Sequence, residues 1–544
     1  MGAELPIGRF LHWEQQTPDQ LYLRQRRDGE FVDLTWAEYG DRVRRLATFL
    51  QEQCPEPGSR VAIYAKNCAD WFIADMAIML SGHVSVPLYP GVARKSLDYI
   101  LDHAEVQVAF IGQAEEMAQV LPELPSALIT VAIGTQTLPC SWTLDQIYEQ
   151  HERLEQVPDL PPDHVFTLMY TSGTTGSPKG VMHDLATVAY AVPTFCQMWK
   201  MGPEDRFVSY LPLAHAAERI IVEMDSLYCG AVVHFVESQE SFVEDLRAIR
   251  PTLFFSVPRL WVKFKQGVES RFPPLLLRVL LSLPVVGRRL AMKIRAGLGL
   301  DQTTCFITGS APTPPEVHRW YRRLGIVLRD GYGMTENFIY GTIAQEDKPL
   351  IGAVGSPVGE GEIRIGEGGE VLMRSGALMR GYYRDPERTA LAIQNGWLHT
   401  GDKGRIDERG RLFLTGRVSD TFKTSKGKFI DPGPWEASLG GLAEVDQVMV
   451  FGHGLDQPMA LVVLAESALS LPGERVVALL TGHLQTINAG HARFEQVGRV
   501  GYCRQPWTPQ NGLTTPTLKI RRAALEEKFR PAMLASKEAV VSLD

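Results

Sequence analysis

Short apolar runs that read as β-strands alternate with helical patterns along most of this chain. The runs are β-branched or aromatic and are bounded by Gly, Pro or polar residues: Val61–Tyr64, Val106–Ile111, Leu128–Ile133, Val165–Tyr170, Val232–Val236, Leu253–Val257, Cys305–Thr308 and Ile326–Leu328. Such alternation indicates βα units, in which parallel strands are joined by crossover helices. We therefore predict an α/β fold whose large N-terminal domain contains parallel-rich sheets.

One of the intervening helices is marked at its start. Thr35 and Glu38 have the spacing of a capping box, in which each side chain satisfies a backbone N–H of the helix end. Tyr39, Val43 and Leu50 then fall on one apolar stripe at helical spacing. The pattern predicts a helix that packs this stripe against the core.

The pattern of residue types along the chain changes twice towards the C-terminus. From about residue 350, Gly and charged residues alternate with short apolar pairs, which is typical of a small antiparallel β region. A second change follows Gly416. We predict an N-terminal domain over residues 1–418, including a β region at about 350–418, and a mobile α+β C-terminal domain over residues 419–544.

Composition excludes several classes of protein. The formal net charge is −8, from 55 Lys and Arg against 63 Asp and Glu, so the overall charge does not favour binding of nucleic acid. The 7 cysteines are scattered without a C-x-x-C pair, which excludes a recognisable zinc or iron–sulfur framework and indicates a reducing compartment. The N-terminus lacks a signal-peptide core, and the apolar stretches fall short of the roughly 20 residues that cross a bilayer. We expect a cytoplasmic protein.

The most specific local pattern is the run of small, hydroxylated and basic residues that follows the strand at 165–170. Glycines let backbone N–H groups approach phosphate oxygens, while hydroxyls and a lysine add donors and positive charge. The run does not match the Walker A pattern. Its candidate phosphate-binding residues are Thr171, Ser172, Gly173, Thr174, Thr175, Gly176 and Lys179.

This run resembles the signature of the adenylate-forming superfamily, which includes acyl-CoA synthetases, peptide-synthetase adenylation domains and luciferases. Four further segments resemble that family's motifs and occur in its order along the chain. They are Gly309-Ser310-Ala311-Pro312, Asp330-Gly331-Tyr332-Gly333-Met334-Thr335-Glu336, the pair Thr400-Gly401-Asp402 with Gly416-Arg417, and Asn511 to Lys519.

The resemblance implies that ATP activates a carboxylate, with attack on the α-phosphorus and departure of pyrophosphate. It assigns Mg²⁺ to Glu336 and contact with the α-phosphate to Thr335. It also places adenine beside Tyr332 and the loop at 309–312, with the ribose hydroxyls on Asp402 and Arg417 nearby. Because two anions must meet in this reaction, a site with a cation and oriented donors is physically required.

The resemblance further implies that Lys519 bridges the carboxylate and the α-phosphate during adenylation, carried by a C-terminal domain that turns about a hinge. The matching hinge position is Ser419, which departs from the Asp or Lys of many relatives. The segment from Lys423 to Lys428 resembles the loop that lines the pantetheine path, so CoA is the expected second substrate; alternatively its lysines are surface charges.

Several segments resemble the long-chain acyl-CoA synthetases in particular: Leu211 to Arg219, Arg250-Pro251-Thr252, Ser256 to Trp261 and Gly381-Tyr382-Tyr383. This resemblance implies that His215 lies at the mouth of the acyl tunnel as a catalytic residue. Alternatively, His215 is a hydrogen-bonded structural histidine. Glu218 and Arg219 are expected to form an ion pair at the same place. The resemblance thus implies conversion of a medium- or long-chain fatty acid to acyl-AMP and then to acyl-CoA.

Other interpretations stay open at this point. The acyl group could pass to a carrier protein or another acceptor, or the chain could be an inactive homologue that binds acyl or nucleotide ligands. The apolar and basic segment at 272–290 predicts either a partly buried helical hairpin or a peripheral contact with anionic lipid. Acyl chain length, pathway and the choice between monomer and homodimer have no sequence motif.

Overall fold

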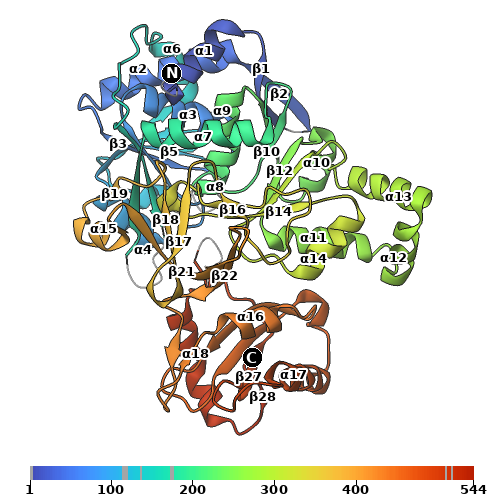
Figure 1. The fold of residues 1–544 in the computed structure, drawn as a ribbon. Helices are drawn as coiled ribbons and strands as arrows, with labels where there is room; N and C mark the ends of the chain where they lie inside the picture. Colours follow the sequence, from blue (N-terminus) through green and yellow to red (C-terminus); the bar gives the residue numbers. More distant parts are fainter. Residues whose placement is uncertain are drawn as a thin grey trace. The chain divides into compact units, whose positions relative to one another are not determined.

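The computed structural model describes residues 4–27, 29–112, 120–134, 138–171, 177–508, 511–515 and 519–544. The chain forms two compact units (Figure 1). The first contains the described residues up to Ile363 together with Met373–Leu398, and the second contains Arg364–Leu372 and His399–Asp544. The predicted α/β fold with a small β region and a smaller C-terminal part is confirmed.

An eight-stranded sheet is the largest element of the first unit and has the order β19-β9-β8-β4-β3-β5-β6-β7. Its strands from β8 to β7 are parallel to one another, as the βα alternation predicts. The strands are β3 (Arg60–Tyr64), β4 (Val84–Pro87), β5 (Val106–Ile111), β6 (Ile129–Ala132), β7 (Trp142–Thr143), β8 (Val165–Thr171), β9 (Lys179–Asp184) and β19 (Gly381–Tyr382).

Strand β3 shows why this sheet has a core on each face. Its side chains alternate between faces because a strand has a period of two. Val61 and Ile63 join the core that includes the helices α1 (Pro6–Gln16), α2 (Trp36–Gln53), α3 (Ala69–Leu80) and α7 (Leu185–Trp199). Ala62 and Tyr64 join the core under α4 (Arg94–His103). The predicted capping box at Thr35 and Glu38 starts α2.

Two smaller sheets also belong to the first unit. One has the order β10-β11-β1-β2 and the other the order β12-β13-β14-β15-β16. Their strands are β1 (Leu21–Arg27), β2 (Glu30–Thr35), β10 (Arg206–Ser209), β11 (Val232–Phe235), β12 (Leu253–Ser256), β13 (Cys305–Thr308), β14 (Leu328–Tyr332), β15 (Thr342–Ile343) and β16 (Ser356–Pro357). The remaining helices of this unit are α6 (Leu144–Gln150), α8 (Ala216–Glu218), α9 (Asp225–Cys229), α10 (Phe242–Ile249), α11 (Pro258–Glu269), α12 (Pro274–Ser282), α13 (Pro284–Gly297), α14 (Pro315–Arg323) and α15 (Pro386–Ala392).

The β region expected near residue 350 contains β17 (Glu362–Ile365), β18 (Glu370–Arg374), β20 (Ile393–Gln394), β21 (Trp397–Ile406) and β22 (Leu412–Arg417). Its pairs β20–β21 and β21–β22 are antiparallel, as predicted.

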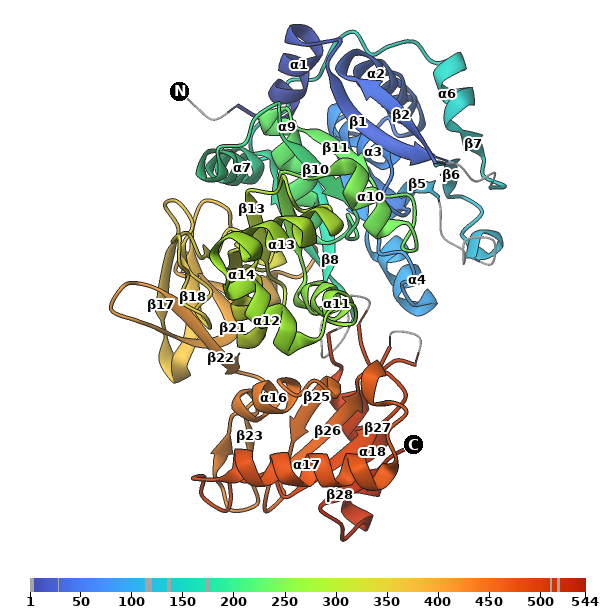
Figure 2. The same ribbon diagram turned by 90° about the vertical axis from the view of Figure 1, so that its right-hand side faces the viewer.

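The chain after the β region forms a short hairpin and a sheet of order β25-β26-β27-β28, both within the second unit. Figure 2 shows α17 and α18 packed along this sheet. The elements are β23 (Phe422–Lys423), β24 (Phe429–Ile430), α16 (Gly433–Gly440), β25 (Val445–Phe451), β26 (Met459–Leu464), α17 (Gly473–Asn488), β27 (Arg499–Cys503), α18 (Arg522–Ala535) and β28 (Val540–Ser542).

Sequence patterns missed or displaced some elements. The strand expected at 326–328 is β14 and starts only at Leu328, because Ile326 still bonds back to Tyr321 at the end of α14. Strand β9 was not predicted, since it follows a Gly- and Pro-rich run and carries His and Asp rather than a β-branched pattern. Within the described residues, none of the helices has the length and apolarity needed to span a bilayer.

A buried ion pair joins α3 to the strands beside it. Both side chains of the Arg219–Asp75 pair are 1% exposed, and the guanidinium donates to both carboxylate oxygens at 2.6 Å. Arg219 also donates to Thr167 on β8 and lies 3.5 Å from Glu223. The expected ion pair between Glu218 and Arg219 is therefore wrong, because Arg219 turns towards α3 and β8 instead.

A second buried contact fixes β9. His183 is fully buried, and its Nε2 lies 2.7 Å from the backbone oxygen of Thr335, so Nε2 carries the proton and donates. Burial lowers the pKa of His183 to about 4. The contact joins the strand after the phosphate-binding run to the Thr-Glu motif of η3 (Thr335–Asn337), across 152 positions of sequence.

Replacing Arg219 with Met should destabilise the first unit strongly. Asp75 would stay buried without its cation, and loss of one partner of a buried pair costs about 3–5 kcal/mol. The matched control is Arg374→Met, whose ion pair with Glu362 has side chains 47% and 53% exposed and should be worth at most about 1 kcal/mol. Thermal and urea unfolding of both variants measures the difference. Equal stabilities would show that the buried pair does not hold these elements together.

The His183 ring should make the first unit less stable in acid. Its folded pKa of about 4 lies below the unfolded value, so the unfolded chain binds the proton first and stability falls as the pH drops from about 6.5 towards 4. The loss should approach about 3 kcal/mol. His183→Asn keeps an N–H donor but does not titrate, so it should flatten this part of the pH profile of unfolding. His12→Asn, which removes an exposed ring, is the control; identical profiles for the two variants would contradict the prediction.

Candidate functional site

The phosphate-binding run joins two paired strands. β8 ends at Thr171 and β9 begins at Lys179, and these two residues are partners in the antiparallel register. Ser172, Gly173, Thr174, Thr175 and Gly176 lie outside the described residues. The two described ends of the run are therefore held side by side by strand pairing.

Lys179 meets the Thr-Glu motif at the side chain of Tyr382. The lysine Nζ lies 4.9 Å from the centre of the Tyr382 ring, and the Tyr382 hydroxyl donates to Glu336 Oε1 at 2.9 Å. Tyr382 itself belongs to β19, which pairs with β9 opposite Val181. Burial and the neighbouring Glu336 carboxylate both raise the pKa of Tyr382, so the phenol stays protonated and remains a donor. A cation, a phenol and a carboxylate are thus gathered in one half-buried place.

Backbone contacts fix Thr335 and Glu336 beside this cluster. The carbonyl of Thr335 accepts from His183, and the carbonyl of Glu336 accepts from the N–H of Met379 at 2.8 Å. Glu336 is neither buried nor fully exposed. Its position is therefore set through the main chain, and the residue is only partly buried.

The two segments assigned to adenine lie at the ends of adjacent strands. Gly309 to Pro312 follow β13, and Asp330 to Tyr332 end β14, its parallel neighbour. A Cβ on Gly309 would lie 3.1 Å from the backbone oxygen of Gly331, so the two chains approach closely there. Ser310 has φ 68°, a left-handed conformation that bends the chain away from the strand. Parallel strand ends are where ligands bind in α/β sheets.

Gly333 is required by a close approach of the backbone. A Cβ there would lie 2.5 Å from the backbone oxygen of Ile339, which the neighbouring main chain cannot accommodate. Tyr332 precedes it and pairs with Thr342 on β15. His318 Nε2 lies 3.0 Å from Asp330 Oδ2, so the Asp330 carboxylate is held within the fold.

The ribose pair and the C-terminal lysine belong to the second unit. Asp402 on β21 and Arg417 on β22 are partners in the antiparallel register, with Arg417 Nε 3.0 Å from Asp402 Oδ1. The main chain of Lys519 is bonded to the main chain and the side chain of Thr515: Thr515 N–H donates to Lys519 O at 2.8 Å, and Lys519 N–H donates to Thr515 Oγ1 at 3.1 Å. Lys519 is exposed, and its main chain is held by these two hydrogen bonds.

His215 caps a short helix. Its Nδ1 accepts from the N–H of Ala217 at 3.1 Å, which is a structural contact at the start of α8. The neighbouring Glu218 is buried and accepts from the N–H of Tyr210 at 2.8 Å. Desolvation raises the pKa of Glu218 to about 8. His215 therefore has a structural role as a helix cap. Its catalytic role at the mouth of a fatty-acid tunnel stays a prediction.

The expected metal ligand has the right chemistry for Mg²⁺. No group of three or more His, Cys, Asp or Glu side chains gathers as a metal site in the part of the chain that the structure describes. Mg²⁺ in nucleotide enzymes takes only one or two carboxylates and completes its shell with phosphate oxygens and water. The carboxylate of Glu336, oriented by Tyr382, fits that requirement.

Sequence reasoning missed His183 and Tyr382 as parts of this site. His183 lies only four positions after Lys179, so its closeness to the predicted run was a usable signal. In the sequence Tyr382 stands out only as part of a Gly-Tyr-Tyr segment. Its contact with Glu336 spans 46 positions and depends on the pairing of β19 with β9, which no local pattern encodes.

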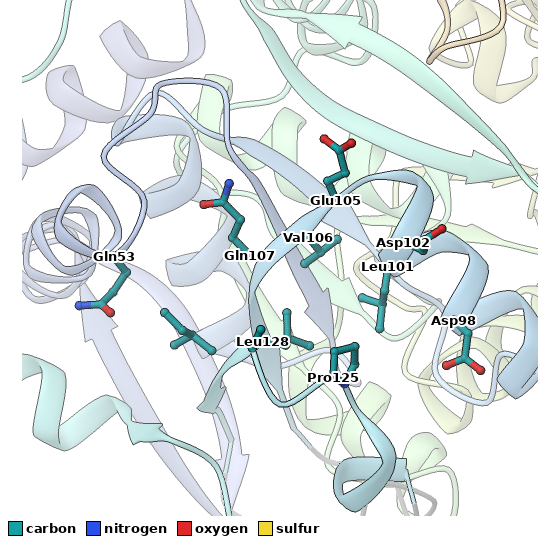
Figure 3. A pocket seen from close by; sticks show the side chains of 11 residues that line it. Gln53, Asp98, Leu101, Asp102, Glu105, Val106, Gln107, Pro125 and Leu128 are labelled. Carbon is teal, nitrogen blue, oxygen red and sulfur yellow. The ribbon is translucent and has the colours of Figure 1, made fainter.

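A cavity of about 540 Å³ lies beside α4 and β5 (Figure 3). Its wall combines Leu101, Leu128 and other apolar side chains with the acidic Asp98, Asp102 and Glu105. Two of these acids are already paired, Asp98 with Arg94 and Glu105 with Arg60 and Arg384. The described residues that line it include none of the predicted site residues, so the cavity is separate from the Lys179–Glu336 cluster.

Comparison with known proteins agrees with the family that the motifs resemble. Residues 10–383 match the family model of the AMP-binding enzyme, and residues 419–536 match that of the AMP-binding enzyme C-terminal domain. The long chain acyl-CoA synthetase 6, peroxisomal, of Arabidopsis thaliana is 30% identical, over 96% of this chain and 85% of its own length. The long-chain-fatty-acid–CoA ligase FadD15 of Mycobacterium bovis is 27% identical, over 95% and 94%.

A solved structure shows the same fold. It is the A domain of carboxylic acid reductase from Segniliparus rugosus in complex with AMP and a co-purified carboxylic acid, with a TM-score of 0.79 and 23% identity over 98% of this chain and 94% of that one. The order of motifs, the strands that carry them and the two family models agree. The chain belongs to the AMP-binding enzyme family, within the adenylate-forming superfamily that its motifs resemble.

Proposed function

We propose that this protein is an ATP- and Mg²⁺-dependent fatty acid–CoA ligase that forms acyl-AMP and then acyl-CoA, releasing pyrophosphate and AMP. The observation that carries the proposal is the meeting of Lys179 and Glu336 at Tyr382. A cation and a metal-binding carboxylate in one accessible place are what an enzyme needs to bring a carboxylate to a triphosphate. The names of the full-length relatives, which are long-chain acyl-CoA synthetases, support a fatty acid and CoA as the other substrates.

The residues of the first unit divide the adenylation step between them. Lys179 and the N–H groups of the phosphate-binding run hold the phosphates, and Thr335 donates to the α-phosphate. Glu336 would hold the Mg²⁺ ion, which would neutralise phosphate charge when bound. Tyr382 keeps the Glu336 carboxylate in place through its hydroxyl. Tyr332 and Gly309 to Pro312 receive the adenine at the ends of β14 and β13.

The second unit supplies the ribose contacts and the catalytic lysine. The Asp402 carboxylate accepts from the ribose hydroxyls, with Arg417 holding it from the next strand. Lys519 bridges the acid and the α-phosphate, because a compact charge on a long flexible stem can reach into a site from another domain. The segment from Lys423 to Lys428 includes the loop that connects β23 to β24. In this proposal it lines the path of the pantetheine thiol.

Contacts around Ser419 support it as the hinge of a mobile domain over residues 419–544. The N–H of Val418, just before it, donates to Gly401 on β21. Asp420, just after it, pairs with Arg522 at 2.8 Å, and Arg522 also pairs with Glu436 of α16. Ser419 is exposed between these two anchored neighbours, so a change of its φ and ψ would move the following residues as a body.

The cysteines support a cytoplasmic location. All 7 are free thiols in a chain of 544 residues, which suits a reducing compartment.

The test is release of AMP and pyrophosphate from ATP and Mg²⁺ across fatty acids of increasing length, with and without CoA. AMP that appears with CoA and peaks at medium or long chains is expected. Acid-dependent pyrophosphate exchange without turnover on CoA would instead assign the acyl group to a carrier protein or another acceptor. Absence of turnover and of exchange with every acid would make the protein an inactive binding homologue.

Lys519→Ala should lower acyl-AMP formation by about 10²-fold or more, because a charge that stabilises the transition state is lost. Thioester formation from synthetic acyl-AMP and CoA should stay close to the unmodified rate, since the bridging contact serves only the first step. Lys537→Ala, another exposed lysine of the second unit, is the matched control and should affect neither half-reaction. If Lys519→Ala slowed both half-reactions equally, Lys519 would not act in adenylation alone, and the assigned role would be wrong.

A further inference from the structure

Two helices of the first unit expose an unusual number of large apolar side chains. Leu275 and Val279 of α12 are 79% and 59% exposed, and Val285 and Met292 of α13 are 64% and 67% exposed. Leu276 of α12, Val286 of α13 and Leu283 between the two helices are also exposed. Scattered exposed leucines are ordinary on a protein, but a gathered apolar patch marks a surface for interaction.

This exposure does not arise from a missing core. Leu277 of α12 and Ala291 and Ile294 of α13 are buried in the cluster that also contains Trp320 of α14. The predicted partly buried hairpin is therefore confirmed, and it has one apolar side packed inwards and a second one turned outwards. Figure 1 shows both helices at the outer edge of the first unit, beyond α11 and α14, and Figure 2 shows them from that side.

The charged residues of α12, α13 and their connections have one sign. Residues 270–297 contain six basic residues and no acidic one, in a chain whose net charge is −8. The basic residues are Arg271, Arg278, Arg288, Arg289, Lys293 and Arg295, and the first five of these are exposed. A positive surface with protruding apolar side chains complements a layer of anionic head groups above acyl chains.

A small cavity lies at the base of α12. It has a volume of about 200 Å³ and is lined by Leu277, Leu281 and Trp320 together with the cationic Arg278 and Arg323. Its one acidic side chain, Glu269, is paired with Lys265 at 3.1 Å. The cavity therefore offers positive charge next to an apolar wall, which again matches an anionic lipid.

We propose that α12 and α13 form a peripheral membrane-binding surface that takes anionic phospholipid bilayers. We name it the α12–α13 surface: the seven exposed apolar side chains between Leu275 and Met292 with the basic residues of 270–297. The apolar side chains enter the boundary between head groups and acyl chains, and the guanidinium and ammonium groups lie against the phosphates. The proposal goes beyond the ligase activity and does not depend on it.

The experiment is co-sedimentation of the full chain with phosphatidylcholine vesicles and with vesicles that also contain phosphatidylglycerol, without ATP or acid. Binding to the anionic vesicles is expected, and it should weaken as salt rises because ions screen the charges. The double variants Leu275→Ser/Val279→Ser and Arg288→Glu/Arg289→Glu should each bind at least about tenfold more weakly. Their exposed positions allow folding to be retained, which circular dichroism checks.

Two controls match these variants. Leu391→Ser removes an apolar side chain that is 69% exposed on α15, and Arg409→Glu reverses an exposed charge between β21 and β22. Both should bind the anionic vesicles like the unmodified protein. Failure of the unmodified protein to bind, or equal binding by all variants, would overturn the proposal.

Sedimentation velocity distinguishes the other occupant of such a surface, a second copy of this chain. A dimer that Leu275→Ser/Val279→Ser converts to monomer, with vesicle binding absent, would assign the surface to self-association and overturn the membrane proposal. Because acyl-AMP formation is assayed separately with acid in detergent-free solution, loss of vesicle binding and loss of ligase activity are told apart.

Discussion

The antiparallel pairing of β8 with β9 is the constraint on which the candidate site depends. It sets Thr171 opposite Lys179, so the two described ends of the phosphate-binding run are fixed. The same strand β9 then carries His183 to the carbonyl of Thr335 and pairs with β19, which brings Tyr382 to Glu336. Strand β9 therefore positions the phosphate-binding run, the Thr335–Glu336 motif and Tyr382 relative to one another. A change that displaced β9 would displace all three.

Charged groups in the first unit are of two kinds: a buried structural ion pair and partly buried groups at the candidate site. The Arg219–Asp75 pair is 1% exposed on both sides, and its guanidinium donates to both Asp75 and Thr167, so it stabilises the arrangement of α3 and β8. Glu336 and Lys179 are only partly buried and meet through a tyrosine rather than through each other. A site that must receive a metal and phosphates keeps its charges accessible, whereas a structural pair is closed to solvent.

Much of the fold followed from local pattern. The strands β5 and β13 occupy the predicted ranges, and the capping box starts α2, because side-chain period and end-capping act over a few residues. Strand β9 was missed because its burial comes from its neighbours on both sides rather than from its own composition. The Glu218–Arg219 pairing was wrong for the same kind of reason: Asp75, the true partner of Arg219, is 144 positions away.

The sequence by itself determined the family, the order of the motifs and the chemistry of their side chains, because these are properties of residue type and spacing. Tertiary structure alone decided which of those side chains meet: Tyr382 with Glu336, and His183 with Thr335. It also decided that the hairpin at 274–297 turns a second apolar side outwards. Periodicity can show that a helix has apolar residues, but only the packing of the whole unit decides how many of them find a partner.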